Sequence, residues 1–279
     1  MTNFIDLKHA RIAHTVVGNG PDLVFVHGWP LDSRTYRHVI PELSKHFTCH
    51  LIDLPGVGET VWNKQTPISI EAHCHTLREV VDALNLSSYA LVAHDSGGMF
   101  ARHLAAHDPD RVRGLVLSNT DIPGYHSPTL KLLVNSAGLP GVSVLMRLLI
   151  RNQMFRLSKY FGKGMYYDLD QFEGEFGDLY IRPLYQDKEV LNGQMQLIYG
   201  WNWDFIDDLT AIHGQIKAPV QLIWGENDVI FPLKEARPMV NEFGSGAELK
   251  VVKESCLYVH EEQPEQFVEH ALPFLQSCF

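Results

Sequence analysis

The chain has 279 residues, of which 45% are hydrophobic and 20% charged, and its formal net charge is −10 at pH 7. These proportions are typical of a globular protein large enough for one α/β domain with an insertion. The acidic balance argues against a nucleic-acid partner, which needs a basic face, and the lack of a run of about 18 apolar residues argues against a membrane span. The start of the chain has no secretory pattern, and the four cysteines show no CxxC spacing. We therefore expect a cytoplasmic protein with free thiols and no membrane partner.

The first part of the chain alternates between short apolar runs and amphipathic segments. Apolar residues with helical spacing predict a helix over residues 69–84, with Ser69 as its N-cap. A second predicted helix follows the turn at Asp95 and ends near His107, because Pro109 cannot continue it. Buried strands are predicted at residues 22–26, 48–53, 89–93 and 112–118. This alternation favours a parallel sheet that is covered by helices on both faces.

Residues 122–210 have a different character. They contain no clear buried strand, and they hold 14 of the 29 Phe, Tyr and Trp residues of the chain. This density favours helices that cover an aromatic-lined cavity, although an ordinary helical core has the same composition.

Short apolar runs typical of buried strands occur again in the last part of the chain. Strands are predicted at residues 219–225 and 248–252, with a helix around 233–242 between them. A last helix is predicted to begin near Pro264, because proline is favoured at the first helical position.

The stretch VAHDSGGMF, residues 92–100, has the pattern of a sharp turn between a strand and a helix. Such a turn needs small residues two places before and two places after the attacking residue. Asp95 satisfies this requirement, with Ala93 before it and Gly97 after it. Moving the register to Ser96 would put the bulky His94 where a small residue is needed. The pattern therefore predicts Asp95 as the nucleophile.

Five stretches occur in an order that identifies a resemblance to α/β-hydrolase-fold enzymes: HGWP, DLPGVGET, AHDSGG, GENDVIFP and HEEQPE. With an aspartate at the turn, the chain resembles the branch that contains epoxide hydrolases and haloalkane or haloacid dehalogenases. The resemblance covers essentially the whole chain. It implies a mostly parallel eight-stranded sheet flanked by helices, a core of residues 1–121 and 211–279, and a mainly helical cap at 122–210. It also implies a small hydrophobic substrate, no cofactor, and a monomer or homodimer.

The resemblance also implies roles for the residues around the turn. Asp95 would attack a carbon atom and form an alkyl-enzyme ester, which an activated water would then hydrolyse. The backbone N–H groups of Trp29 and Ser96 would form the oxyanion hole. The helix after the turn should keep the pKa of Asp95 low. We expect His27 to brace its loop, and we place both His27 and His94 at the pocket.

The position of the catalytic base breaks the family's pattern. Asp228 resembles the acid that orients the catalytic histidine. The family places that histidine seven residues before the proline of its E-x-P tail, which here is Pro264, and seven back stands Leu257. A leucine cannot take a proton from water. His260, three residues further on, is the alternative base.

Three interpretations remain open. In the first, His260 acts as the base. In the second, the base is missing, so the ester forms and persists, because attack on carbon needs no base whereas ester hydrolysis does. In the third, the protein binds ligands without hydrolysis, or catalyses another reaction.

The electrophile is predicted to be an epoxide, with an organohalide as the second choice. Haloalkane dehalogenases of this family carry a tryptophan after the nucleophile, where this chain has Ser96. For a haloacid, the nearest arginine is Arg102, which the helix should turn away from the pocket. Opening an epoxide needs a proton donor, usually a pair of tyrosines in the cap. The predicted cap residues of the pocket are Tyr125, Tyr166, Tyr167, Tyr199, Trp201 and Trp203. No metal site is predicted, because His103 and His107 share a helix face with no evident third ligand.

Overall fold

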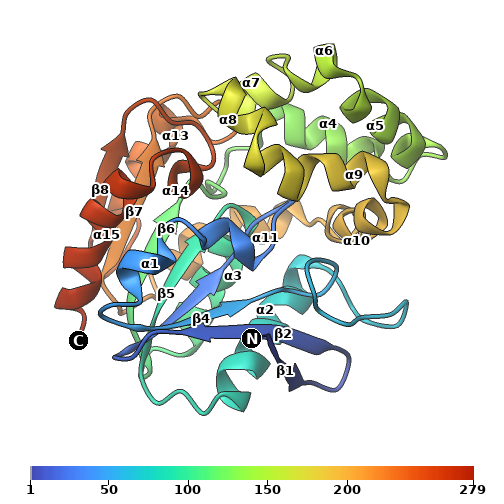
Figure 1. Cartoon of the computed structure of the whole chain (residues 1–279). Coiled ribbons are helices and arrows are strands. Elements are labelled where there is room, and N and C mark those ends of the chain that lie inside the picture. Colours follow the sequence, from blue (N-terminus) through green and yellow to red (C-terminus); the bar gives the residue numbers. More distant parts are fainter. Residues whose placement is uncertain (1) are drawn as a thin grey trace.

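The computed structural model describes residues 2–279 and contains one sheet of eight strands (Figure 1). The strand order is β1-β2-β4-β3-β5-β6-β7-β8. β2 pairs antiparallel with both of its neighbours, and all other pairs are parallel. The strands are β1 (Asn3–Asp6), β2 (Arg11–Val17), β3 (Asp22–Val26), β4 (Thr48–Ile52), β5 (Tyr89–His94), β6 (Val112–Ser118), β7 (Val220–Gly225) and β8 (Ala247–Val252). This confirms the predicted fold class.

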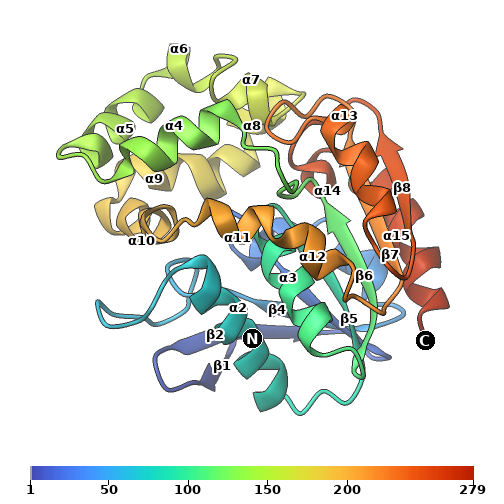
Figure 2. The same ribbon diagram turned by 180° about the vertical axis from the view of Figure 1, so that it is seen from behind.

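Helices cover both faces of the sheet because the central strands are apolar on both sides. Side chains of β3 alternate, so Leu23 and Phe25 pack in one core while Val24 and Val26 pack in the other. The first core lies under α1 (Ile40–Leu43) and α15 (Pro264–Ser277), which Figure 1 shows in front of the sheet. The second lies under α2 (Ile70–Ala83) and α3 (Ser96–His107), which Figure 2 shows in front.

The predicted elements appear with small shifts at their ends. The Ser69 side chain accepts a hydrogen bond from the N–H of Ala72, as an N-cap should. The helix expected around 233–242 is two short pieces instead: α13 (Leu233–Ala236) and a 3-10 helix (Arg237–Asn241). Pro238 has no N–H to continue an α-helix there, which explains the break. Strands β1 and β2 lie outside the strands that the sequence predicted.

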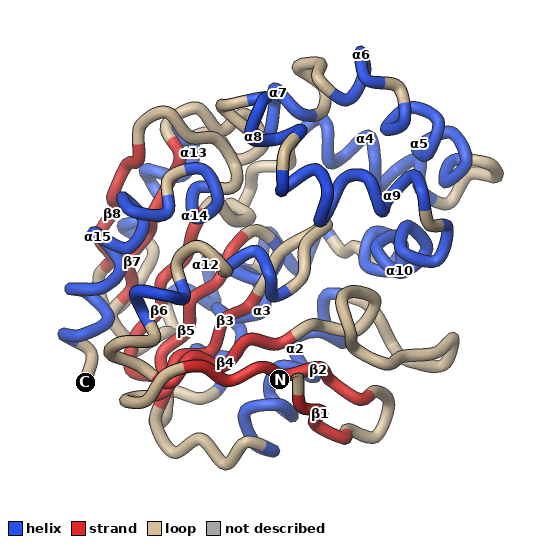
Figure 3. The backbone as a smooth tube through the Cα atoms, viewed as in Figure 1, coloured by secondary structure: helices blue, strands red, loops and turns tan. Residues whose placement is uncertain are grey.

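Between β6 and β7 the described chain forms helices and loops only, and Figure 3 shows α4 to α10 of this segment as a group away from the strands. The helices α4 to α9 lie at the carboxyl ends of β5 and β6, while α11 and α12 lead back to the sheet (Figures 1 and 2). Their bounds are α4 (Pro128–Ala137), α5 (Val142–Arg151), α6 (Gln153–Arg156), α7 (Gly162–Met165), α8 (Leu169–Glu173), a π-helix (Gly177–Ile181), α9 (Arg182–Gln186), α10 (Lys188–Tyr199), α11 (Trp203–Asp207) and α12 (Leu209–His213). Within residues 2–279, no helix combines the length and the apolar character that crossing a membrane requires.

Candidate active site

Asp95 lies at the tip of the turn between β5 and α3, with a backbone φ of 52°. A positive φ is unusual for a residue with a side chain, and such strain is of order 1–3 kcal/mol. Two glycines allow the close approach of β3 to this turn. A Cβ at Gly97 would overlap the backbone oxygens of Val26 and His27, and a Cβ at Gly28 would overlap the Asp95 side chain.

Two backbone N–H groups hold one oxygen of the Asp95 carboxylate. Oδ1 accepts hydrogen bonds from Trp29 N at 3.0 Å and from Ser96 N at 2.6 Å. These are the two groups that the resemblance assigns to an oxyanion hole. Oδ2 has no hydrogen-bond partner within residues 2–279. The Ser96 side chain is buried and lies outside the wall of the cavity that holds Asp95.

The pKa of Asp95 is higher than the sequence led us to expect. Burial raises it to about 6, and the N–H groups of Ser96 and Trp29 only partly offset this effect. The expectation of a low pKa was therefore wrong, because loss of water outweighs the helix N-terminus. At neutral pH the carboxylate is still mostly ionised, as a nucleophile must be.

An apolar cavity of about 540 Å³ holds Asp95 beneath the inserted helices. Trp29, Leu257 and Tyr258 form its wall on the side of the sheet, and α4, α5 and α7 supply most of the rest. The complete lining is Trp29, Asp95, Pro128, Thr129, Leu130, Leu132, Leu133, Ser136, Met146, Leu149, Ile150, Phe155, Lys159, Tyr160, Phe161, Gly164, Met165, Ile198, Trp201, Ile230, Leu257 and Tyr258. A site of this size and character suits a small hydrophobic molecule.

Leu257 is held in the cavity wall through its backbone. Its N–H donates to the oxygen of Met165 at 3.1 Å, and its oxygen accepts from His94 Nε2 at 3.0 Å. Its side chain is 3% exposed. An aliphatic group therefore faces the same cavity as Asp95, at the position where the resemblance puts a histidine.

The structure does not bring His260 to Asp95. The imidazole is fully buried, and its Nε2 lies 2.7 Å from the Thr35 hydroxyl. That hydroxyl donates its own proton to Glu261, so Nε2 of His260 must be the donor to Thr35. The ring packs on Tyr36 at 4.9 Å between centroids, away from the cavity lining. Burial lowers the pKa of His260 well below its usual value.

Asp228 is buried and has three hydrogen-bond donors, none of them a histidine. Its Oδ2 accepts from Asn119 Nδ2 at 2.6 Å, and its Oδ1 accepts from the N–H groups of Ile230 at 2.7 Å and Phe231 at 3.0 Å. Burial nevertheless raises its pKa to about 7. Asp228 is thus anchored beside the cavity, but within residues 2–279 it orients no base.

Only one of the predicted pocket side chains, Trp201, lines the cavity. His27 braces its loop by accepting from Leu54 N at 3.0 Å, and His94 lies buried behind Leu257. Trp203 packs against the ring of His126. The four tyrosines lie elsewhere: Tyr125 in the loop after β6, Tyr166 in a buried aromatic cluster, and Tyr167 and Tyr199 on the surface. These placements correct the predicted list.

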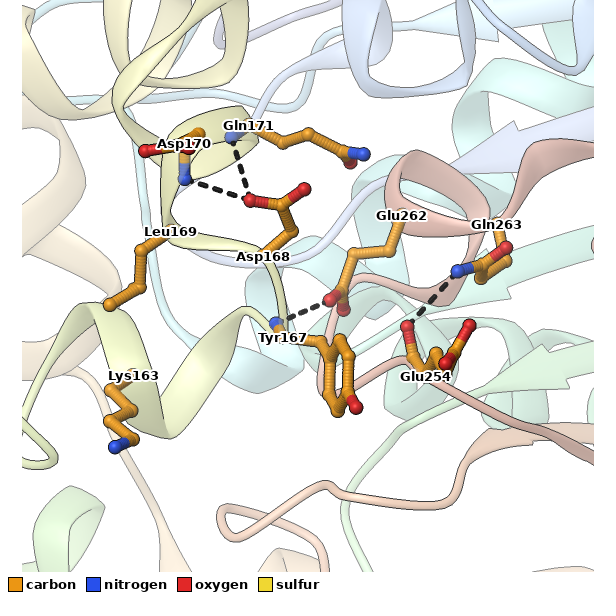
Figure 4. A pocket seen from close by; sticks show the side chains of 9 residues that line it. All are labelled: Lys163, Tyr167, Asp168, Leu169, Asp170, Gln171, Glu254, Glu262 and Gln263. Carbon is orange, nitrogen blue, oxygen red and sulfur yellow. Dashed lines mark hydrogen bonds between the residues drawn. The ribbon is translucent and has the colours of Figure 1, made fainter.

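Tyr167 borders a second, polar groove of about 650 Å³ (Figure 4). Its backbone N–H donates to the buried Glu262 carboxylate at 2.6 Å, and Asp168 and Glu254 lie on the same groove. Although larger, this groove lacks Asp95 and every other residue near the turn. It is therefore not the site of the chemistry predicted for Asp95.

Two tyrosines that line the cavity, Tyr258 and Tyr160, are absent from the predicted list. Within residues 2–279 the Tyr258 hydroxyl has only the Met165 sulfur as a partner, at 3.8 Å, and burial, with a smaller effect of Asp95, raises the pKa of Tyr258 well above its usual value. Trp201 lines the cavity as predicted, and its Nε1 is buried with no partner. Tyr160 reaches the cavity from the rim, where it is 64% exposed. The position of Tyr258 next to Leu257 is the one sequence signal that could have indicated it.

Arg102 points away from the cavity, as expected. Its guanidinium is buried against Thr120 and His213. Within residues 2–279, His, Cys, Asp and Glu side chains form no group of three that could hold a metal ion.

Comparison with known proteins places this geometry in context. The model of the family described as alpha/beta hydrolase fold matches residues 21–264. A soluble epoxide hydrolase of a Corynebacterium species is 25% identical, with 95% of this chain and 93% of that protein covered. Haloalkane dehalogenase 2 of Mycobacterium tuberculosis is 34% identical, over 43% of this chain and 42% of that protein. An alpha/beta hydrolase fold protein from Burkholderia ambifaria superposes with a TM-score of 0.81 at 23% identity, with 97% of each chain covered.

Proposed function

The chain belongs to the α/β-hydrolase fold family, and from this premise we propose that it reacts with small apolar epoxides through an ester on Asp95. One observation carries the proposal: a carboxylate oxygen of Asp95 is held by two N–H groups, inside an apolar cavity of about 540 Å³. In this proposal residues 1–121 and 211–279 form the catalytic core, and residues 122–210 form the cap.

The first chemical step is an in-line displacement at carbon. An oxygen of the Asp95 carboxylate forms a bond to an epoxide carbon, and the bond from that carbon to the epoxide oxygen breaks. The released oxygen takes a proton from Tyr258, whose hydroxyl has no strong competing partner. The products are a hydroxyalkyl ester of Asp95 and a tyrosinate that solvent reprotonates.

The second step needs a base at a position where the chain has Leu257. Base catalysis contributes about 10²- to 10⁴-fold to such a step. His260 is tied to Thr35, so it is a poor substitute. We therefore propose that the ester forms readily and is hydrolysed slowly.

An organohalide is the second candidate substrate. The unpartnered Nε1 of Trp201 could stabilise a departing halide in the cavity, and Asp95 would form the same type of ester.

Intact-mass measurement with a panel of apolar epoxides and haloalkanes tests the proposal. The expected result is one adduct per chain, mapped to Asp95 by peptide analysis and absent from Asp95→Asn. Turnover without an adduct would mean that another base works. Reversible binding with neither adduct nor product would mean that the protein is a non-hydrolytic ligand binder.

A further inference from the structure

The outer surface of the inserted helices is unusually apolar. Eight of the 17 large hydrophobic side chains with high exposure in residues 2–279 lie between positions 132 and 160. Helix α5 is the centre of this surface: Val144 is 62% exposed, Leu145 is 54% exposed and Leu148 is 60% exposed. At 100° per residue these side chains share one side of the helix with Leu149. Soluble monomers rarely expose a contiguous apolar patch of this kind.

Neighbouring segments extend this surface on both sides. Leu132 on α4 is 71% exposed, Leu139 in the following turn is 60% exposed, and Met154 on α6 is 86% exposed. Leu132 and Leu149 line the same cavity, so α4 and α5 meet at this surface. Figure 2 shows α4, α5 and α6 together at the edge of the molecule, away from the sheet. We call the exposed apolar side chains of residues 132–154 the apolar face.

The charge of this region is opposite to that of the rest of the chain. Residues 122–167 contain six Lys or Arg and no Asp or Glu, whereas the remaining residues contain 17 Lys or Arg and 33 Asp or Glu. Lys131, Arg151 and Lys159 are exposed, and none of these three pairs with a carboxylate in the described chain. Basic side chains around an apolar helix face are the pattern of proteins that lie on anionic lipid surfaces.

We propose that the apolar face, with its basic rim, docks on an anionic lipid bilayer. A second copy of the chain would fit the leucines, but a symmetric contact would bring the basic rims of both copies together. An anionic bilayer satisfies both features, because its acyl region accepts the leucines and its phosphates accept the basic groups.

The cavity opens on this surface. Leu132, Lys159 and Tyr160 are exposed and also line the cavity that holds Asp95. A hydrophobic molecule dissolved in lipid would thus reach Asp95 without crossing water. Docking itself requires no chemistry at Asp95, so this inference does not depend on the reaction proposed above.

Co-sedimentation of the full chain with phosphatidylglycerol vesicles or phosphatidylcholine vesicles tests the proposal. The expected result is binding to the anionic vesicles, weakened by added salt, and far weaker binding to phosphatidylcholine. Leu148→Glu should weaken binding by at least about tenfold, because it removes a Leu side chain that docking would bury in the lipid. Each of Lys131→Glu and Arg151→Glu should weaken it by roughly fivefold or more. Asp95→Asn should bind like the wild type.

Matched controls separate this surface from general effects. Val61→Glu changes an apolar side chain that is 52% exposed in the loop between β4 and α2, and Lys217→Glu changes an exposed lysine just before β7. Both should bind vesicles like the wild type. If Leu148→Glu alters thermal unfolding, Met154→Glu is the second test, because that side chain is 86% exposed. Absence of binding to anionic vesicles would overturn the proposal. So would a dimer in solution that Leu148→Glu dissociates.

Discussion

The oxygen of Leu257 accepts a hydrogen bond of 3.0 Å from Nε2 of His94, the residue that precedes Asp95. This bond ties the loop after β8 to the end of β5, so the Leu257 side chain faces the cavity that holds Asp95. The loop thus presents an aliphatic side chain to the cavity, at the position where the resemblance predicts the catalytic base. Burial raises the pKa of Asp228, and no histidine of residues 2–279 is hydrogen-bonded to its carboxylate.

Leu257→His should therefore speed hydrolysis of the Asp95 ester, so that the ester becomes an intermediate of a complete catalytic cycle. The new imidazole would lie in the cavity wall, where Asp228 could orient it and where it could take a proton from water. We expect product formation from a reactive epoxide to rise by about 10²- to 10⁴-fold. Steady-state product assays together with intact mass would show product rising as the adduct disappears.

Leu257→Asn is the matched control, because it adds a polar group of similar size that is not a base. It should leave the adduct in place. A folded Leu257→His variant with no gain in turnover, on a substrate that labels Asp95, would contradict the idea that only the base is missing.

The rate of ester formation should depend on pH through Asp95. Its pKa is raised to about 6, and the carboxylate is the reactive form. The rate should be constant above about pH 7, and at pH 5 it should fall to about one-tenth of that value, because only that fraction is ionised. The rate of mass increase between pH 5 and 8 measures this. A rate that is still constant down to pH 4 would mean that the carboxylate is better stabilised than its burial indicates.

The strands that the sequence predicted well are those whose side chains are buried along nearly their whole length. The prediction at 22–26 matches β3, and that at 112–118 matches β6, because both are apolar runs between helix-covered faces. β2 was not predicted because its pattern is mixed and its last residues, Val16 and Val17, are exposed where β1 no longer pairs with it. The turn at Asp95 was predictable because its sharp bend requires small residues two places before and after it, and these can be found in the sequence alone.

The pocket residues were poorly predicted because their placement depends on distant partners. The direction of His260 is set by Thr35, which lies 225 positions away in the chain. Tyr166 is turned into a cluster with Phe172 and Phe176 rather than into the cavity. Several inserted helices have only four or five residues, so apolar spacing does not define which side faces inward.

Asp95→Asn should stabilise the protein at neutral and alkaline pH. Since burial raises the pKa of Asp95 above its usual value, the stability linked to its protonation is fully present below about pH 4 and is lost as the pH rises through 6. The amide oxygen can still accept from Trp29 and Ser96, and no charge is buried. We expect a gain of about 1–3 kcal/mol at pH 8 and little gain at pH 4. Thermal unfolding across this pH range is the measurement, and an equal gain at both pH values would contradict the assignment.

The close approach at the turn should make Gly97 intolerant of a methyl group. Gly97→Ala would drive a Cβ into the backbone oxygens of Val26 and His27, which cannot move without disturbing β3. We expect a loss of about 2–4 kcal/mol in the free energy of unfolding, together with slower ester formation. Gly138→Ala is the control, because no atom lies within 4 Å of its added Cβ. Denaturant unfolding of both variants tests this, and equal stability would show that the turn is looser than described.

Paired variants of Tyr258 and Trp201 should separate the two candidate substrates. Tyr258→Phe removes the hydroxyl proposed to protonate an opening epoxide, so it should slow labelling by epoxides by about 10²-fold while labelling by haloalkanes changes little. Trp201→Phe removes the unpartnered N–H proposed for a halide, so haloalkanes should be the more affected class. Rates of mass increase with one epoxide and one haloalkane of similar size give the comparison. If Trp201→Phe slows both classes equally, the indole acts through the shape of the cavity and not as a hydrogen-bond donor. If Tyr258→Phe leaves epoxide labelling unchanged, the proton comes from another donor, and Tyr160 at the rim is the next residue to change.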